Sequence, residues 1–509
     1  MLLSSIRVVG YLQYRELHYY LYHMTVCKIQ INDEVNCKLI GLDLSTRKRL
    51  VDKFKYEVPG ARYQPAVRLG RWDGKVSFAQ LGGSTYINLL PEVLEFLDKE
   101  GWDVELDDQR DYSTKFEFDP ITEDTFSDKK WPKGHPKEGE PIYLRDYQPQ
   151  ILNGFLNNLQ SVQEVATGAG KTIMTAALSK SVEKYGRSIV IVPNRSLVTQ
   201  TEADYKNLGL DVGVYFGERK EYNKTHTICT WQSLNNMMKT TKSGEAEVEI
   251  GDFIEDVVCV MVDEVHMAKA DALKTLLTSV FARVPIRWGL TGTIPKEEHA
   301  KISIYCSLGP VVGKLTASDL QEAGHLANCH VNIVQLIDHV EYKDYQQELK
   351  YLLETTGRLT YMRNLILTVN ETGNTLVLVD RVATGKLLVE YLGDKAVFVS
   401  GATKGTTRQA EYDAVATATG KIIVATYGVA AVGINIPRIF NLVLVEPGKS
   451  FVRVIQSIGR GIRKAEDKDH VEIWDITSTC KFAKRHLTAR KKFYTEANYP
   501  FSIEKAEWQ

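Results

Sequence analysis

The sequence predicts an α/β protein with two tandem parallel-sheet domains that follow a smaller α/β domain. Short apolar runs alternate with helix-like segments from about residue 142 almost to the end of the chain, as in parallel sheets covered by helices. The chain has 509 residues. This is too long for one hydrophobic core, and a prior of about 150 residues per domain suggests roughly three units.

The bulk composition is that of an ordinary globular chain. The formal net charge of −1 leaves no global field that would draw the protein to nucleic acid, so any such binding must come from local patches. Seven cysteines are scattered without a CxxC pair. An odd number at such spacings argues for reduced thiols and against structural zinc, and it favours a cytoplasmic location.

The first 24 residues form an N-terminal extension in this interpretation. They contain charges at Arg7, Arg15 and Glu16 and lack the basic-then-apolar layout of a signal peptide. These residues are either an upstream extension of the reading frame or a genuine N-terminal helix. No run of residues reaches the length of a membrane span.

Residues 25–107 predict the small α/β domain. Strands are expected at 26–31, 75–78 and 85–89, and helices at 45–54 and 91–101. Residues 108–141 are rich in Asp, Glu, Lys, Pro and Gly and predict a linker. The small domain therefore precedes the larger ones as a separate accessory domain.

A basic stretch lies inside this accessory domain. From Arg47 to Lys75 there are nine basic and three acidic residues, a local net charge of +6, with Tyr63 and Trp72 among them. Cations that bind phosphates, together with a ring that stacks on a base, make a nucleic-acid surface, to which we assign Arg68, Arg71 and Trp72. The alternative is a solvated face around one core tryptophan.

The remaining chain divides into two parallel-sheet domains, with a seam near residues 308–325. The first is expected over 142–308 and the second over 309–480, followed by a basic C-terminal helix or tail over 481–509. Expected strands are 188–192, 226–229, 258–262 and 286–290 in the first domain, and 331–336, 375–379, 396–399, 421–425, 441–445 and 471–474 in the second.

The stretch Val165-Ala-Thr-Gly-Ala-Gly-Lys-Thr172 predicts a phosphate-binding loop. Two glycines let successive backbone N–H groups turn inward, and a helix is expected to begin just after them. The lysine would reach the β and γ phosphates of ATP, and the threonine hydroxyl would hold Mg²⁺. A glycine-rich turn before an ordinary helix is the alternative. The candidate nucleotide ligands are Thr167, Gly168, Ala169, Gly170, Lys171 and Thr172.

Two acids end a later apolar strand, in Val260-Met-Val-Asp-Glu-Val-His266. The carboxyl ends of parallel strands line the ligand crevice of an open sheet, so these acids can reach the same phosphates. Asp263 would hold Mg²⁺ through water, and Glu264 would position or deprotonate the attacking water. The alternative is that both carboxylates face the start of a helix.

With these motifs, residues 142 to about 480 resemble the superfamily-2 nucleic-acid helicases and translocases that carry a DEVH box. The resemblance implies two RecA-like domains that close and open on a nucleic-acid strand as ATP is bound and hydrolysed. It also assigns adenine recognition to Gln148, assisted by Arg145. A glutamine amide offers the donor and the acceptor that an adenine edge requires.

Further segments carry the resemblance. Leu290-Thr-Gly-Thr293 resembles the motif that couples the ATP site to the strand. Two segments resemble those that touch the backbone of the tracked strand, with Asn194 and Arg195 in the first and Thr230, Trp231 and Gln232 in the second. In the second domain, residues 425–435 and 456–463 resemble motifs V and VI, which implicate Thr426, Gly433, Asn435, Gln456, Arg460 and Arg463. The two arginines would reach the γ phosphate across the cleft.

The run Arg-Leu-Gly-Arg-Trp-Asp-Gly-Lys at 68–75 resembles the accessory domain of UvsW-type phage recombination helicases, which act on branched DNA. This implies fork regression and junction migration in recombination and repair, with a single-strand-binding or recombination protein as a partner. Two alternatives stay open. The first is an XPB-like or restriction-type translocase that pumps duplex without separating it, and the second is an ATP-gated clamp that never steps.

Overall fold

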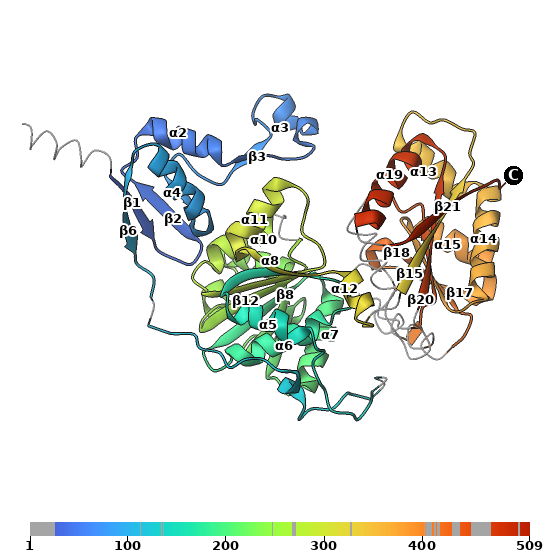
Figure 1. Cartoon of the computed structure of the whole chain (residues 1–509), viewed down its shortest axis with the longest axis horizontal. Helices are drawn as coiled ribbons and strands as arrows, with labels where there is room; N and C mark the ends of the chain where they lie inside the picture. The colour runs from blue at the N-terminus through green and yellow to red at the C-terminus, as the bar shows by residue number, and fades with distance from the viewer. Residues whose placement is uncertain are drawn as a thin grey trace, which may run out of the picture. The chain divides into compact units, whose positions relative to one another are not determined.

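The computed structural model describes residues 26–508 with internal gaps (Figure 1). No helix in this described part is both long enough and apolar enough to span a membrane. The expected N-terminal extension and the candidates Gly433, Asn435, Gln456, Arg460 and Arg463 lie outside the described residues. The gaps are 112, 134, 136, 247, 267–270, 326–327, 402, 404–409, 412–413, 415–417, 430–437, 449–469 and 497–498.

The chain forms two compact units. The first contains the accessory domain and most of the first motor sheet, and the second contains the second motor sheet with two short segments from the first motor region. The first unit comprises Met1–Gln163, Met174–Val192 and Glu202–Val312, and the second comprises Glu164–Ile173, Pro193–Thr201 and Gly313–Gln509.

The accessory domain has a four-stranded sheet in the order β5-β2-β1-β6. Helix α2 begins after Asp43, whose carboxylate accepts a hydrogen bond from the Thr46 amide and so caps the helix. This is the small α/β domain that the sequence predicts. Its elements are β1 (Val26–Ile31), β2 (Asn36–Ile40), α2 (Leu44–Lys53), β3 (Lys55–Glu57), η1 (Ala61–Tyr63), α3 (Pro65–Arg68), β4 (Lys75–Ser77), β5 (Ser84–Tyr86), η2 (Ile87–Leu89), α4 (Leu90–Lys99) and β6 (Asp103–Asp108).

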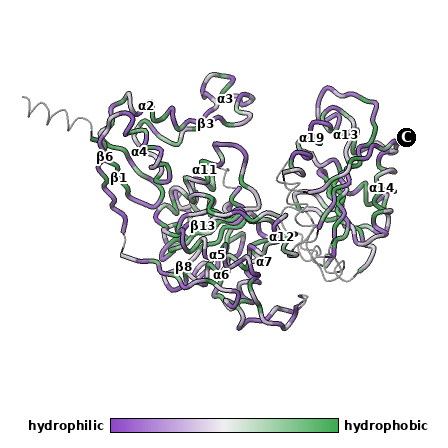
Figure 2. The backbone as a smooth tube through the Cα atoms, viewed as in Figure 1, coloured by the Kyte–Doolittle hydropathy of each residue, from purple (hydrophilic) through white to green (hydrophobic). Residues whose placement is uncertain are grey.

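Alternate residues of β1 build the core of this domain. Cys27, Ile29 and Ile31 are buried, because successive side chains of a strand point to opposite faces. The same apolar cluster includes Cys306 of α11 (Glu298–Leu308), which belongs to the first motor domain. Strand β6 is the hydrophilic edge of the sheet, as Figure 2 shows, whereas β13 is predominantly hydrophobic.

The segment expected as a linker packs against the first motor domain over part of its length. Phe116 and Phe118 contact the ring of Tyr185 edge-on, at centroid distances of 5.1 and 5.6 Å. Ile121 and Phe126 are buried, the latter in the short helix η3 (Glu123–Phe126). These apolar anchors fix the segment to the motor domain, so it differs from a free tether.

The first motor sheet has eight strands in the order β10-β9-β11-β8-β12-β13-β7-β14. The pairs β9–β11, β11–β8, β8–β12 and β12–β13 are parallel, as predicted, and β10 is antiparallel to β9. The strands are β7 (Gln160–Val165), β8 (Arg187–Val192), β9 (Val212–Phe216), β10 (Arg219–Lys220), β11 (His226–Thr230), β12 (Val257–Asp263), β13 (Ile286–Thr291) and β14 (Val311–Leu315).

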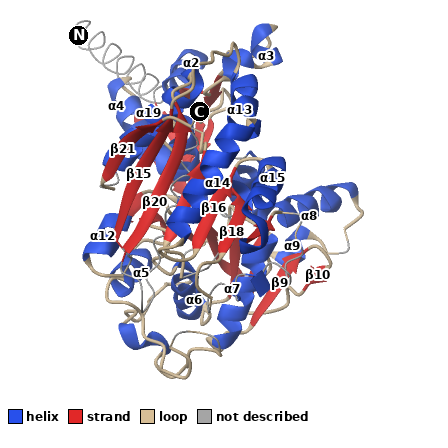
Figure 3. Cartoon of the chain, turned by 90° about the vertical axis from the view of Figure 1, so that its right-hand side faces the viewer, coloured by secondary structure: helices blue, strands red, loops and turns tan. Residues whose placement is uncertain are grey.

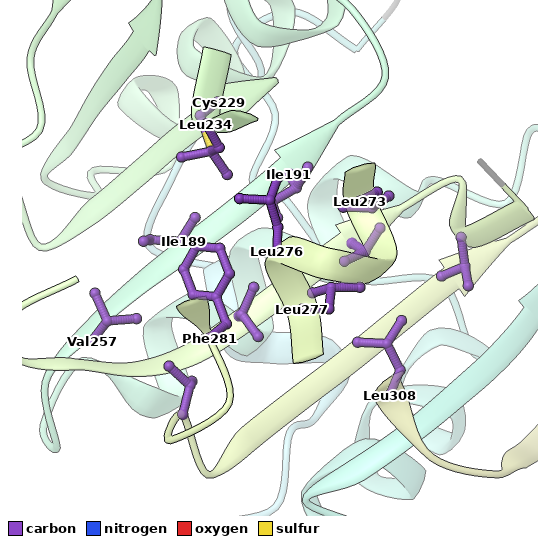
Figure 4. Close-up of a cluster of buried hydrophobic side chains, with 14 of the residues drawn as sticks. Ile189, Ile191, Cys229, Leu234, Val257, Leu273, Leu276, Leu277, Phe281 and Leu308 are labelled. Carbon is purple, nitrogen blue, oxygen red and sulfur yellow. The ribbon is translucent and has the colours of Figure 1, made fainter. Parts of the chain in front are cut away.

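Helices cover both faces of this sheet. Ile189 and Ile191 of β8 join an apolar cluster with Leu273 and Leu276 (Figure 4), while the Ser188 hydroxyl on the opposite face lies 3.3 Å from that of Ser179 in α6. The alternation along one buried strand thus places helices on two sides. The helices are α5 (Gln148–Leu156), α6 (Lys171–Val182), α7 (Arg195–Asn207), α8 (Trp231–Ser243), α9 (Ile250–Phe253), α10 (Asp271–Thr275), the π-helical turn η5 (Leu276–Val280) and α11.

The second motor sheet has seven strands in the order β17-β18-β16-β19-β20-β15-β21, all paired in parallel (Figure 3). Its strands are β15 (Asn328–Leu336), β16 (Thr375–Val379), β17 (Ala396–Val399), β18 (Ile422–Thr426), β19 (Asn441–Val445), β20 (His470–Ser478) and β21 (Phe501–Ala506). The helices are α12 (Ala317–Glu322), α13 (Tyr345–Glu354), α14 (Thr356–Asn370), α15 (Val382–Leu392), η6 (Gly393–Lys395) and α19 (Lys481–Glu496).

The C-terminal residues differ from the tail expected over 481–509. Residues Phe501–Ala506 form β21, which pairs with β15 from Val331↔Phe501 to Leu336↔Ala506. The strand was missed because its alternating polar residues lie at a sheet edge, where burial is slight. The second sheet therefore needs the last residues of the chain.

Candidate functional site

The predicted phosphate loop connects β7 to α6. Gly168 and Gly170 have φ values of 92° and 82°, which are backbone conformations that residues with a Cβ rarely adopt. The Ala169 amide donates to the Ala166 carbonyl at 3.3 Å, and the Ala166 amide donates to Leu315 O at 2.9 Å. Helix α6 begins at Lys171, followed by Thr172. A loop that turns twice in this way before a helix fits a phosphate group.

The two predicted acids stand where β12 ends. Asp263 is the last residue of the strand, and Glu264 follows in a left-handed conformation with a φ of 60°. The Glu264 amide donates to the Asp263 carboxylate at 3.0 Å. In the sheet, β13 lies between β12 and β7, the strand that leads into the phosphate loop. The acids thus end a strand of the same sheet as the loop.

A buried histidine ties this acid pair to the neighbouring strand. His266 Nδ1 lies 3.3 Å from Glu264 Oε2 and 3.1 Å from Thr291 Oγ1. The Thr291 hydroxyl donates to the Thr293 carbonyl at 2.9 Å. The sequence pointed to the segment 290–293, but it did not reveal this contact. The register Asp263↔Leu290 brings the two motifs side by side.

Gln148, the predicted adenine reader, is buried and holds its own turn together. Its side-chain Oε1 atom accepts a hydrogen bond from the backbone N–H of Arg145 at 2.8 Å, and the backbone N–H of Gln148 donates to the Arg145 carbonyl at 2.8 Å. The Arg145 side chain is exposed and donates to Tyr147 Oη at 2.9 Å. The side-chain oxygen of Gln148 therefore already has an intramolecular partner.

The predicted strand-contacting residues fall into two groups. Asn194 and Thr230 cap helices, because their side-chain oxygens accept hydrogen bonds from the amides of Leu197 and Ser233 at 3.2 and 3.3 Å. Trp231 is half-buried against the apolar core. The exposed members of these segments are Arg195 and Gln232, and Thr426 is half-buried at the end of β18.

The second unit contains a buried charge network that the sequence did not predict. Glu446 directly follows β19 with a φ of 42°, and the Arg358 guanidinium donates to Glu446 Oε1 at 2.8 Å and to the Asp338 carboxylate. All three side chains are buried, and this burial raises the pKa of Glu446 to about 7. The partners are far apart in the sequence and carry no local signal.

Helix α19 is only partly the basic surface that was expected. Lys481, Lys484 and Arg485 are exposed, but Arg490 is buried and donates to both carboxylate oxygens of Asp475 at 2.8 and 2.9 Å. The helical spacing places Arg490 on the face that packs against the sheet. This arginine stabilises the second unit instead of facing solvent.

Three members of the basic stretch, Arg62, Arg68 and Arg71, lie in an exposed excursion between β3 and β4, residues 58–74, that extends away from the sheet (Figure 1). The other basic residues of the stretch lie on α2, β3 and β4. Arg68 and Arg71 are exposed, and Tyr63 is 62% exposed beneath the Arg62 guanidinium, 4.8 Å from the ring centroid. Trp72 is half-buried, and its Nε1 donates to the Lys75 carbonyl at 2.6 Å. The exposed ring is therefore that of Tyr63.

Two family models match the chain. Residues 141–296 match the model described as "Type III restriction enzyme, res subunit", and residues 357–465 match "Helicase conserved C-terminal domain". Among curated proteins, the "ATP-dependent DNA helicase uvsW" of Enterobacteria phage T4 is 26% identical over 90% of this chain and 92% of its own length. The "DNA 3'-5' helicase XPB" of Mycobacterium tuberculosis is 24% identical over 72% of this chain and 66% of its own.

The chain is also similar to solved structures. The T4 UvsW crystal structure aligns over 95% of this chain and 100% of its own, with 20% identity and a TM-score of 0.45. A fragment of a putative HsdR subunit of a type I restriction enzyme from Vibrio vulnificus aligns over 93% and 85%, with 16% identity and a TM-score of 0.55. The second likeness supports the tandem motor fold.

The two parallel sheets, the phosphate loop and the acid pair define an ATP-hydrolysing motor with two RecA-like domains, and the family models give the same class. The chain is an ATP-dependent DNA helicase of superfamily 2. Within this class it is similar to the UvsW helicase of phage T4 along nine tenths of its length. The predicted fold class and enzyme class are thereby confirmed.

Proposed function

We propose that this helicase acts on branched DNA, where it regresses forks and migrates four-way junctions. The observation that carries this proposal is the exposed β3–β4 excursion in a domain that precedes the motor. This excursion presents Arg68, Arg71 and the ring of Tyr63 to solvent. Arginines bind phosphates at any DNA sequence, and an aromatic ring stacks on an unpaired base. The two arginines together with the ring therefore suit a place where duplex DNA meets single-stranded DNA.

The ATP site is assigned residue by residue. The amides of residues 167–170 cradle the phosphates, and Lys171 neutralises the β and γ phosphates. Thr172 and Asp263 would hold Mg²⁺, which supplies positive charge at the phosphate oxygens when it is bound. Glu264 orients the attacking water and accepts its proton. The hydroxyl and the carboxylate are donors that Mg²⁺ prefers, and the glycine turns support the phosphate cradle.

The second motor domain completes this site in the proposal. Arg460 and Arg463 reach the γ phosphate when the domains close, and Gly433, Asn435 and Gln456 line the nucleotide. Gln148 reads adenine through its amide, with Arg145 beside it. Closing and opening around the strand turns hydrolysis into steps.

The tracked strand contacts both motor domains. Arg195 and Gln232 supply exposed donors to phosphates, and Asn194, Thr230, Trp231 and Thr426 frame that path. The Asn194 Nδ2 atom is buried with no hydrogen-bond partner among the described residues. The seven cysteines are all free and buried, which supports a reducing cytoplasm, that of the host if the chain is phage-encoded. A single-strand-binding or recombination protein would supply the substrate.

The test compares two charge-matched double variants of the full chain. Arg68→Ala/Arg71→Ala should weaken four-way-junction binding and lower its salt dependence by about one to two units of slope, because each lost phosphate contact releases roughly one fewer counterion. Lys48→Ala/Lys53→Ala, on α2 outside the excursion, serves as the control. Equal losses of junction affinity in the two double variants would mean that only the net charge matters, and the excursion would not have its assigned role.

Single-ring variants identify the stacking residue. Tyr63→Ala should cost ~1–3 kcal/mol of junction affinity if its ring stacks on a base. Trp72→Ala should instead lower the melting temperature, since the indole is tied to the Lys75 carbonyl. Reversed results would assign the stacking role to Trp72.

Two further functions are separated by paired assays. A strand-displacement assay detects unwinding, and a triplex-displacement assay detects movement along duplex. An XPB-like or restriction-type translocase would displace the triplex without separating strands, and an ATP-gated clamp would do neither. Similarity to a protein named XPB and to a restriction-enzyme subunit makes the duplex translocase the first alternative.

A further inference from the structure

The accessory domain is seated on one face of the first motor domain, formed by α10, η5 and α11, which we call the docking platform. The Glu34 amide donates to the Ala282 carbonyl at 2.8 Å, just beyond η5. Asn36 Nδ2 donates to Thr278 O at 2.9 Å, and Asn88 Nδ2 donates to Tyr305 O at 2.8 Å. Together with Cys306 in the accessory core, these contacts make the two domains one compact unit.

One cation of the platform is held against aromatic rings of the accessory domain. Lys274 in α10 is half-buried, and its Nζ lies 4.2 Å from the centroid of Phe78 and 5.6 Å from that of Tyr86. A cation over an aromatic face is attracted by the ring quadrupole, more strongly where water is partly excluded. Burial around Tyr86 is also evident in its hydroxyl, whose pKa it raises to about 12.

The platform shares a core cluster with the residue that follows the acid pair. Val265, between Glu264 and His266, belongs to the same apolar cluster as Leu273 and Leu276 of α10 and η5. The buried Arg287 guanidinium donates to the carbonyls of Leu277 and Ser307 and so joins η5 to α11. Close-packed clusters of this kind transmit small displacements. The π-helical turn is a geometry often found at functional sites.

We propose that Lys274 is a positioning residue through which the accessory domain sets the arrangement of Glu264. The contact of Lys274 with Phe78 and Tyr86 couples the accessory domain to α10, so that branched DNA bound to the accessory domain shifts the DEVH box, through the shared cluster, into the arrangement that hydrolyses ATP fastest. Branched DNA on the accessory domain then acts on hydrolysis without touching the nucleotide. This inference rests on the proposed function, since it requires that the accessory domain binds branched DNA.

The test measures ATP hydrolysis by the full chain on a four-way junction and on single-stranded DNA. Lys274→Met keeps the aliphatic stem and removes the charge, so kcat on the junction should fall about fivefold or more, while the KM for ATP and the junction Kd stay unchanged. Lys274→Arg keeps a cation over the rings and should restore kcat. Lys301→Met, on α11 and paired with Glu298, is the matched control and should behave as the parent protein.

Ring variants complete a double-mutant cycle. Tyr86→Leu should lower kcat on the junction as Lys274→Met does, and Tyr86→Phe should leave it unchanged. The double variant Lys274→Met/Tyr86→Leu should have a kcat no lower than that of either single variant. Melting temperatures verify that each variant is folded.

Three results would overturn the inference. These are equal losses of kcat on both DNAs, additive effects in the cycle, and a loss confined to junction affinity, which would make Lys274 a DNA contact. A parent protein that the junction stimulates no better than single strands would instead remove the proposed function, and this inference with it. The parent measurement therefore separates the two failures.

Discussion

The two motor sheets use the same backbone feature for different ends. In each, an acidic residue directly follows a buried parallel strand with a left-handed backbone, Glu264 after β12 at a φ of 60° and Glu446 after β19 at a φ of 42°. Within the described residues, Asp256 is the one other non-glycine residue with positive φ. Such a conformation turns the chain sharply and aims the next side chains along the sheet edge.

The surroundings of the two carboxylates are opposite. Glu264 retains 14% side-chain exposure and faces His266, whereas Glu446 is buried and accepts a hydrogen bond from Arg358. A carboxylate bound to a buried guanidinium cannot change its partner cheaply during a reaction, which suits Glu446 to a structural role. The same backbone position therefore has different surroundings in the two sheets, a solvent-accessible histidine contact for Glu264 and a buried ion pair for Glu446.

The largest expected effect separates the two acids by catalysis. Glu264→Gln should lower ATP hydrolysis by ~10³-fold or more while ATP still binds, because the phosphate loop is intact. Lys171→Ala should lose both binding and hydrolysis. Glu446→Gln, the matched change in the other sheet, should hydrolyse ATP at near-native rates. Steady-state ATPase and nucleotide titrations measure this, and near-native turnover in Glu264→Gln would contradict its role.

The next effect concerns stability. Arg358→Leu removes the cation between Asp338 and Glu446 and leaves two buried carboxylates, so the second unit should lose about 3–5 kcal/mol of stability. Arg363→Leu, five residues further along α14 and half-buried, is the control and should cost much less stability. Denaturant unfolding measures both variants. Similar costs would show that the network stabilises little.

A smaller effect is the pH dependence of that stability. The pKa of Glu446 is raised to about 7 from an ordinary 4.5, so the folded state keeps this proton after the unfolded state has released it. The contribution of Glu446 to stability is full below pH 4.5 and is lost as pH rises through 7, about 3 kcal/mol in total. Glu446→Gln should therefore gain stability relative to the parent between pH 5 and 8. A constant difference across that range would contradict this assignment.

The smallest effect tests how Glu264 is held. His266→Ala removes the ring between Glu264 and Thr291. The kcat should then fall roughly tenfold with little change in ATP affinity, which is the typical effect of removing a residue that orients a reacting group. His266→Asn keeps a polar group near Nδ1 and should recover part of the rate. If His266→Ala raised the Kd for ATP and left kcat unchanged, the histidine would belong to the binding of nucleotide instead.

The parts of the candidate site that could be predicted are motifs made of residues that are adjacent in the sequence. The sequence predicts a phosphate loop at Gly168, Gly170 and Lys171. Only glycine adopts these φ values readily, and the lysine follows at the start of the helix. Asp263 and Glu264 were located because they end an apolar run, and strand ends share one edge of a parallel sheet. Their place on β12, in the same sheet as β7, is as expected.

The parts that escaped prediction depend on partners far away in the sequence. Arg358 meets acids 20 and 88 positions away, and Arg490 looked like one more member of a basic helix until its bond to Asp475 was visible. The polar strand β21 pairs with a strand 170 positions earlier, a relation that no local pattern carries. The expected linker has its apolar side chains on the motor domain.

Periodicity and short motifs encode backbone geometry and local chemistry, so they were enough to predict two parallel-sheet motor domains with a candidate phosphate loop and an acid pair. The folded chain was needed to show which charges are buried, that His266 lies between Glu264 and Thr291, and that Lys274 lies over the rings of the accessory domain. The reason is physical: the environment of a charged side chain is set by whatever packs around it, and packing brings together residues that the sequence keeps apart.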